Sequence, residues 1–250
     1  MMNELVLSLF PGIGIMDHAF EAEGYCMVRG PDLLWGGDIR RFHPPPGVFR
    51  GLVGGPPCQA HSQLVHVVRH RYGDAAVAED LIPEFVRVVV EAKPAWFVME
   101  NVEHAPIPDI PGYHVDASLL DNRWIGGEQR RLHRFCFGTR DGRQLDYSPD
   151  IALFENPEWS PRVLASGGCI GIIEGHPRDK KRLRHLGYRT RAYMQEGLRL
   201  QGLPADYLAH CPFTVTAAIR AIGNAVPYPM ARVVARAVRR ALGNGEVRNG

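Results

Sequence analysis

The segment Gly54-Gly55-Pro56-Pro57-Cys58-Gln59 holds one cysteine in a proline-stiffened turn directly after the apolar stretch 49–53. Proline fixes φ at about −65° and glycine allows a close backbone approach, so the thiol of Cys58 is presented in one direction. Such rigidity suits a nucleophile, although most free cysteines in proteins are ordinary buried thiols. Glu100 follows a second buried stretch, 96–99, so we expect a carboxyl group at the same edge of a sheet as the thiol.

A second chemical signal lies near the N-terminus, where the apolar stretch 5–10 is followed by Gly12 and Gly14 and then by a helical pattern. A strand, a glycine turn and a helix form a common nucleotide-binding device, because the turn lets a ligand approach the backbone. An acid after the second strand suits ribose hydroxyl groups, and an acid after the third element suits an exocyclic adenine amine. Asp32 and Asp38 are therefore candidate contacts to an adenosine group. Turn-capping aspartates are common, and this alternative stays open.

The elements that must position these groups alternate along the chain. Short apolar stretches typical of strands are separated by segments with helical periodicity, which indicates a doubly wound, mostly parallel α/β sheet. The predicted strands cover residues 5–10, 25–29, 49–53, 95–99 and 134–138, and the predicted helices begin near residue 16 and cover 81–92, 193–201 and 227–242.

Between about Thr139 and Leu186 the pattern changes to short pieces punctuated by proline and glycine, which indicates a small irregular insert. We therefore divide the chain into a first part of a cofactor-binding catalytic domain at 1–138, an insert at 139–188, and a return to the catalytic domain at 189–250 that ends in a helix. Between Arg178 and Arg191 seven basic residues accompany a single acid, Asp179. This charge predicts contacts to phosphates, with a solvated charged face as the alternative.

Composition describes an ordinary globular protein. The chain has 250 residues, of which 45% are hydrophobic and 22% charged, and a net charge of +2. No apolar run approaches the roughly 18 residues that span a membrane, and the N-terminus lacks the basic region of a signal peptide. Five cysteines without a Cys-x-x-Cys pair argue against a disulfide framework and against a zinc site. We expect an intracellular protein with reduced thiols and no metal.

Six ordered segments resemble the motifs of the C5-cytosine DNA methyltransferase family. They are Phe10-Pro-Gly-Ile-Gly14, Gly55-Pro-Pro-Cys-Gln59, Glu100-Asn-Val102, Gln129-x-Arg131, Arg199-Leu-Gln-Gly-Leu-Pro204 and Gly223-Asn-Ala-Val-Pro227. Only the predicted insert lies outside them, where the family keeps its variable target-recognition region. The resemblance implies a Rossmann-like methyltransferase fold, S-adenosyl-L-methionine as cofactor, and DNA (cytosine-5-)-methyltransferase activity on a flipped cytosine in a short site of double-stranded DNA.

The resemblance also implies roles for the candidate catalytic residues. Cys58 adds as a thiolate to C6 of cytosine, because C5 is a poor nucleophile until the ring becomes an enamine. Glu100 holds N3 and N4 of the base and offers a proton to N3, and Arg131 belongs to the same catalytic group. The base that removes the C5 proton is not identified by this pattern.

His133 departs from the family pattern Gln-x-Arg-x-Arg, because it stands where the last arginine is expected to touch O2 of the flipped cytosine. In an extended segment Gln129, Arg131 and His133 share one face, while Arg134 points away. Our hypothesis is that His133 donates to O2, which adds a pH dependence because imidazole titrates near neutrality. The alternative is that Arg134 does this work. Two smaller departures are Ile15, in place of a glycine, and His61, in place of an aromatic residue.

The remaining expected contacts divide between cofactor and substrate. The cofactor contacts are Phe10, Gly12, Gly14, Asp32, Asp38, Ile39, Asn224 and Val226. The DNA contacts are Pro57, Gln59, Ser62, Arg69, Arg71, Gln129, Arg182 and Arg184. Residues 62–80 stand where the family has a mobile loop, which we expect to close behind the flipped base.

Two other functions stay open at this point: a transfer-RNA cytosine-5 methyltransferase, and a non-catalytic DNA-binding module on the same fold. We expect double-stranded DNA as the partner, no membrane association, a monomer, and a cytoplasmic, nucleoid-associated protein of bacterial or phage origin. A restriction endonuclease partner and an orphan or phage-borne role are both compatible with the sequence.

Overall fold

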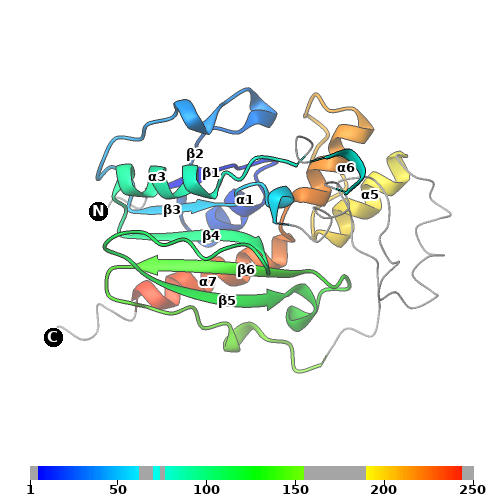
Figure 1. The fold of residues 1–250 in the computed structure, drawn as a ribbon. Helices are drawn as coiled ribbons and strands as arrows, with labels where there is room; N and C mark the ends of the chain where they lie inside the picture. Colours follow the sequence, from blue (N-terminus) through cyan, green and yellow to red (C-terminus); the bar gives the residue numbers. More distant parts are fainter. Residues whose placement is uncertain (1–4, 62–69, 74–76, 155–189, 244–250) are drawn as a thin grey trace.

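The computed structural model describes residues 5–61, 70–73, 77–154 and 190–243. Within these ranges six strands form one sheet with the order β2-β1-β3-β4-β6-β5 (Figure 1). The strands are β1 (Leu5–Leu9), β2 (Cys26–Arg29), β3 (Gly51–Gly54), β4 (Trp96–Val102), β5 (His114–Asp121) and β6 (Leu132–Thr139). The expected doubly wound, mostly parallel sheet is confirmed.

Strand direction decides which residues meet at the edge that carries the chemistry. Strands β2, β1, β3 and β4 run parallel, and Leu9, Gly54 and Met99 lie side by side in the register. Strand β6 runs antiparallel to β4, with His133 opposite Val102. The first residues of β6 therefore lie beside the last residues of β4.

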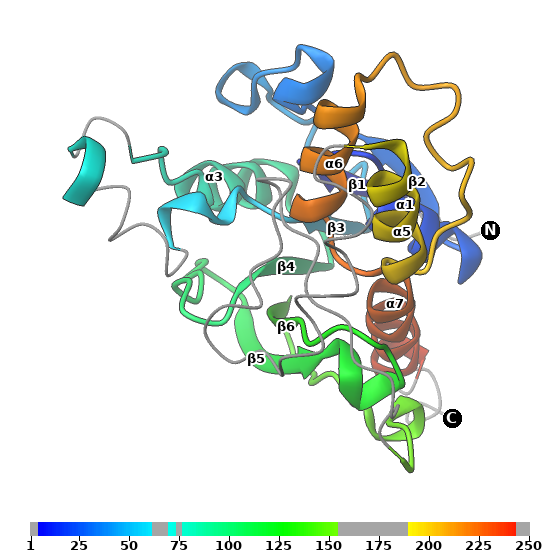
Figure 2. The ribbon, with the colours of Figure 1, turned by 90° about the vertical axis from the view of Figure 1, so that its right-hand side faces the viewer.

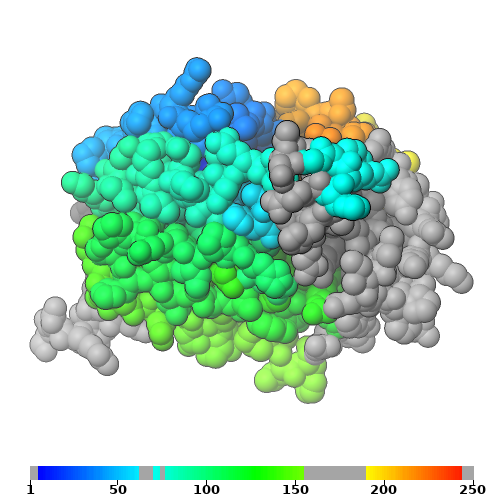
Figure 3. Space-filling model, viewed as in Figure 1, coloured from blue at the N-terminus to red at the C-terminus, as the bar shows by residue number. Residues whose placement is uncertain are grey.

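Helices cover both faces of the sheet. Helix α1 (Ile15–Ala22) packs against α7 (Tyr228–Gly243) on one face, and α3 (Ile82–Ala92) covers the other. Successive strand residues point to opposite faces, so Val6 and Val98 pack toward α1 and α7 while Leu7 and Phe97 pack toward α3. In the space-filling view, α3 lies beside the segment that follows β2 (Figure 3).

The ends of these helices have local causes. Helix α1 starts after Gly14, whose φ of 77° is a conformation that glycine adopts without strain. At the start of α3 the Oδ1 atom of Asp80 accepts a hydrogen bond from the Ile82 amide, and the helix ends at Lys93 in the left-handed region. Thr190 and Thr214 cap α5 (Arg191–Leu200) and α6 (Val215–Asn224) through their hydroxyl groups.

Helices α5 and α6 pack against each other beside α1 (Figure 2). With the residues at the start of α1 they form a third apolar cluster, which includes Ile13, Ile15, Leu198 and Ile222. This cluster joins the C-terminal part of the chain to the glycine turn. No helix in the described ranges is both long and apolar enough to cross a membrane.

The structure contains two elements that the sequence did not predict, β5 and α6. Strand β5 is an edge strand with a half-exposed pattern, and α6 ends at Asn224, inside the family-like motif that begins at Gly223. Leu145 and Tyr147, at the start of the predicted insert, are buried in the main core. Residues 155–189 of that insert lie outside the described residues.

Candidate active site

Cys58 lies at the end of the turn that leaves β3. Pro57 has φ −50° and ψ 121°, and Cys58 begins a short 3-10 helix, Cys58–Ala60. The side chain is partly buried. Burial raises the pKa of the Cys58 thiol, the charge of Glu100 raises it further, and the Arg131 guanidinium lowers it. The thiol therefore shares its electrostatic environment with one carboxylate and one cation.

Glu100 stands on β4 and is almost fully buried. A Cβ atom on Gly55 would lie 2.7 Å from Glu100 Oε2, so only glycine leaves room for the carboxylate in its present position. The neighbouring Asn101 donates from Nδ2 to the carbonyl oxygen of Pro56 at 3.1 Å. The strand that carries the carboxyl group is thus tied to the turn that carries the thiol.

The first residues of β6, with the segment just before it, supply a histidine and an arginine to Glu100. His133 Nδ1 forms a short hydrogen bond with Glu100 Oε1, and Arg131 Nε donates to His133 Nε2 at 3.0 Å. Arg134 Nη1 donates to the carbonyl oxygen of Ala105. Arg131 and His133 share one face and Arg134 leaves it, as the extended pattern predicts. In this arrangement both ring nitrogens of His133 have partners within the protein.

The same segment anchors the C-terminal part of the chain. Arg131 Nη2 donates to the Gly223 carbonyl at 2.8 Å, and Gln129 Nε2 donates to the Leu200 carbonyl at 2.7 Å. The side chain of Gln201 donates to the carbonyl groups of Ile222 and Ala225. The segments 129–131, 200–201 and 222–225, which are distant in sequence, therefore meet at one junction. Gln129 is fully buried at this junction, whereas the sequence suggested a contact to substrate.

The glycine turn after β1 has an unusual backbone. Gly12 and Gly14 have φ of 54° and 77°, and Phe10, which has a side chain, also has φ 54°. The Gly12 amide donates to Asp32 Oδ2 at 2.8 Å, and the Leu34 amide donates to Asp32 Oδ1 at 2.7 Å. Asp32 therefore connects the turn after β2 to the glycine turn.

Asp38 caps a second short 3-10 helix, Ile39–Arg41. Arg40 donates to both carboxylate oxygens of Asp38, and these hydrogen bonds hold the pKa of Asp38 below its ordinary value. The capping interpretation thus describes the geometry of Asp32 and Asp38 alike. A carboxylate accepts up to about four hydrogen bonds. Asp32 accepts two and can accept more, whereas Arg40 alone donates four to Asp38.

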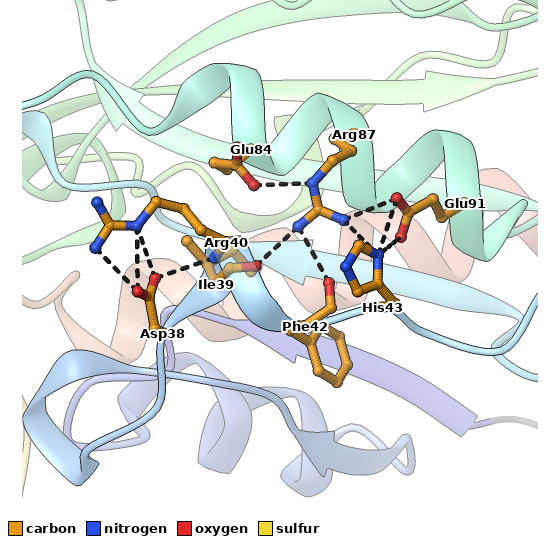
Figure 4. A network of polar contacts seen from close by, with 8 residues as sticks. All are labelled: Asp38, Ile39, Arg40, Phe42, His43, Glu84, Arg87 and Glu91. Carbon is orange, nitrogen blue, oxygen red and sulfur yellow. Dashed lines mark hydrogen bonds and ion pairs between the residues drawn. The ribbon is translucent and has the colours of Figure 1, made fainter.

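Arg87 of α3 fixes the loop that carries Asp38 and Ile39 (Figure 4). Its Nη2 donates to the carbonyl groups of Ile39 at 2.8 Å and Phe42 at 3.1 Å. Its other nitrogens bind Glu84 and Glu91 on the same helix. A single guanidinium therefore joins this loop to α3.

The other predicted residues fall into three groups. Pro57 and the exposed Gln59 flank Cys58, Asn224 ends α6, and Val226 is buried just beyond it. Arg71 is exposed and stacks over the ring of Tyr72. Ser62, Arg69, Arg182 and Arg184 lie outside the described residues.

Sequence patterns did not predict a role for four residues that stabilise the site. Gly55, Arg87 and Gln201 are described above, and the fourth is Asp80. Asp80 Oδ1 lies 3.1 Å from His61 Nε2, at ion-pair distance but without the alignment of a hydrogen bond. Gly55 and Gln201 stand inside family-like motifs, which is a usable signal. Arg87 and Asp80 carry no such signal, because the contacts that tie them to other segments are to the backbone of Ile39 and Phe42 and to the distant side chain of His61.

Comparisons with known proteins agree with this geometry. The model of the C-5 cytosine-specific DNA methylase family matches residues 36–106, which include Cys58 and Glu100. The chain is 25% identical over 237 residues to the orphan methyltransferase M.Rho11sI of Bacillus phage rho11s, covering 81% of this chain and 44% of that protein. It is 28% identical over 232 residues to the type II methyltransferase M.HindV of Haemophilus influenzae, covering 75% of this chain and 74% of that protein.

A solved structure shares the fold over nearly the whole chain. It belongs to a candidate DNA modification methyltransferase encoded within a prophage of E. coli, and it has a TM-score of 0.60 and 16% identity over 96% of this chain and 99% of that one. The chain spans less than half the length of the rho11s relative. In the order of its motifs, in its fold and in these matches, the chain is similar to proteins of the C5-cytosine methyltransferase family.

Proposed function

We propose that this chain is a DNA (cytosine-5-)-methyltransferase that moves a methyl group from S-adenosyl-L-methionine to C5 of a flipped cytosine in a short duplex site. The observation that carries the proposal is the grouping of the Cys58 thiol with Glu100 and Arg131 at one edge of the sheet. The match to the methyltransferase family model and the similarity to named methyltransferases support the reaction class.

In the proposed reaction Cys58 forms a covalent bond to C6 of the base. The electron pair of the C5=C6 bond moves to form C4=C5, the C4=N3 pair moves to N3, and Glu100 gives a proton to N3 as negative charge develops there. When bound, S-adenosyl-L-methionine supplies an electrophilic methyl group. N3 returns its proton to Glu100, loss of the C5 proton restores the C5=C6 bond, and the Cys58 sulfur leaves C6 as a thiolate. Arg131 favours the thiolate form of Cys58, because its positive charge lowers the pKa of the thiol.

The chain's own residues fit this cofactor at the edge of β1 and β2. An added Cβ on Gly12 would meet no atom within 4 Å, so the glycine turn is open where a ligand would approach. We propose that the cofactor lies against the protein backbone in the turn of Phe10, Gly12 and Gly14. Asp32 would accept from ribose hydroxyl groups, and Asp38 with Ile39 would take the adenine. Asn224 and Val226 would complete the site from the C-terminal segment.

Double-stranded DNA is the proposed substrate. C6 of cytosine lies inside the base stack, so the nucleotide must leave it to reach Cys58. We propose that Pro57, Gln59 and Arg71 contact the DNA from the turn after β3 and the segment that follows it. Ser62, Arg69, Arg182 and Arg184 are proposed for the same surface, and the insert at 139–188 is proposed to read the target site.

The biological setting is part of the proposal. The relatives named above come from a phage and a bacterium. The phage protein is named an orphan methyltransferase and the bacterial protein a type II methyltransferase. We propose a bacterial or phage-borne DNA-modifying monomer in the nucleoid, either with a restriction endonuclease partner or without one.

The test is transfer of a labelled methyl group from S-adenosyl-L-methionine to duplex DNA, with Cys58→Ser as the control. We expect label at C5 of cytosine with the native chain and none with the variant, because the serine hydroxyl is a far weaker nucleophile. Label found only in RNA, or in no nucleic acid, would contradict the proposal. Conversion sequencing of DNA from a host that expresses the chain then identifies the site.

A further inference from the structure

We propose that His133 is a positioning residue, which holds Glu100 through a single neutral tautomer fixed by Arg131. The structural basis is the chain of contacts from Arg131 Nε to His133 Nε2 and from His133 Nδ1 to Glu100 Oε1. The functional part of this inference rests on the proposed methyl transfer, in which Glu100 meets the base.

The donors and acceptors determine where the imidazole proton is. A guanidinium group has only donors, so the nitrogen that faces Arg131 Nε at 3.0 Å must be an acceptor. His133 Nε2 therefore carries a lone pair. In a neutral imidazole the other nitrogen then carries the hydrogen, and here that nitrogen faces the Glu100 carboxylate. His133 thus donates to Glu100 while it accepts from Arg131.

The two partners of His133 determine which ring nitrogen carries the hydrogen. Protonation of Nε2 would turn one N–H group directly toward another, that of Arg131. The charged and titratable groups that face this histidine are Glu100 from β4 and Arg131 from the segment before β6, with the Cys58 thiol close to both across the turn after β3. Glu100, Arg131 and His133 are each less than 10% exposed, so water does not readily replace these partners.

This arrangement decides which oxygen of Glu100 meets the base. Oε1 is taken by His133, whereas Oε2 lies against Gly55, in the turn that leads to Cys58. A carboxyl group held at one oxygen presents the other in a fixed direction, which is what a group that takes up a proton on that oxygen and gives it to N3 requires. His133 therefore acts through Glu100, in place of an arginine that would bring a second cation to the thiol.

The inference contradicts the hypothesis that His133 donates to O2 of the cytosine. A donor toward O2 needs a hydrogen on Nε2, either in the other neutral tautomer or in the imidazolium. The two roles thus require different protonation patterns of one ring, which can be measured in the resting protein.

The decisive experiment is a two-bond hydrogen–nitrogen correlation spectrum of the full chain labelled with nitrogen-15 at histidine. The His133 signal is assigned by its loss in H133N or, if that variant does not fold, by its shift in E100Q. We expect the Nδ1–H neutral pattern, because Nε2 accepts from Arg131 and Nδ1 faces Glu100. The exposed His114 provides a comparison signal in the same spectrum. An Nε2–H or imidazolium pattern for His133 would overturn the inference.

A kinetic arm tests positioning through Glu100. H133N keeps a side-chain N–H toward Glu100, so we expect it to lose about tenfold in kcat, while H133L loses about 10²–10⁴-fold, the range for misplaced acid–base groups. KM for DNA should change less than twofold in both. Equal losses in H133N and H133L would overturn the positioning role. The predicted tautomer together with no methylation of any duplex would overturn the proposed function and leave the tautomer assignment standing.

Discussion

Glu100 Oε2 lies 2.7 Å from the point where a Cβ atom on Gly55 would stand. Real Cβ atoms do not approach so closely, so the G55A substitution must push the carboxylate away from the Cys58 turn. We expect methyl transfer to fall about 10²-fold or more, since small displacements of a reacting group are this costly. The measurement is kcat/KM on duplex DNA. G243A is the matched control, because an added Cβ there meets no atom within 4 Å. Native activity in G55A would refute the steric argument.

The E100Q substitution should move thiol reactivity and turnover in opposite directions. The charge of Glu100 raises the pKa of Cys58, so its removal lowers that pKa and shifts alkylation of Cys58 by iodoacetamide to lower pH. Turnover should nevertheless fall by about 10²–10⁴-fold, because glutamine cannot give a proton to N3. Both effects are read on the same preparation, by mass spectrometry and by methyl transfer. A shift of alkylation to higher pH would show that this electrostatic assignment is wrong.

Arg131 and Arg134 form a matched pair on opposite faces of one segment. The charge of Arg131 lowers the pKa of Cys58, so R131M should shift alkylation of Cys58 to higher pH. Arg134 instead acts on Cys136. The pKa of Cys136 is raised to about 12, mainly by burial, and the charge of Arg134 opposes part of this rise. R134M should therefore leave the pH dependence of Cys58 alkylation unchanged. An equal shift of Cys58 in both variants would mean that the two charges are not separated as described.

The rate of methyl transfer by the native chain should rise between about pH 7 and 9. Burial and the charge of Glu100 raise the pKa of Cys58 above its ordinary value, so the thiolate is the minor form at neutral pH and its fraction grows with pH. The check is single-turnover transfer measured across this range, with protein integrity followed by circular dichroism. A rate that is flat or falls toward alkaline pH would contradict this assignment of the nucleophile.

The junction around Gln201 should matter more for stability than the ion pairs beside it. In Q201L the carbonyl groups of Ile222 and Ala225 lose their buried donor, which should lower the free energy of unfolding by about 2–3 kcal/mol. Arg199 binds Glu128 and Glu196 at the surface, so R199Q should cost about 0–1 kcal/mol. Urea denaturation of both variants measures the difference. A larger loss in R199Q would overturn this ranking.

The sequence predicted the parts of the site that depend on strand geometry. Cys58 and Glu100 follow adjacent parallel strands, whose ends meet at one edge, and alternation along an extended segment separates His133 from Arg134. Partners set by tertiary packing were not predictable. No local pattern states that His133 lies between Arg131 and Glu100, that Gln129 faces Leu200, or that Arg87 binds the loop of Ile39. Strand β5 was missed because an exposed edge strand lacks a strong apolar pattern.

The bond from Arg131 to the Gly223 carbonyl has a consequence for biosynthesis. The Gly223 carbonyl is translated 92 residues after Arg131, and a guanidinium only donates, so this acceptor for Arg131 does not exist until then. A chain that terminates before residue 223 cannot form this bond. The position of Arg131 beside His133 is therefore completed only after the segment around Gly223 has been made.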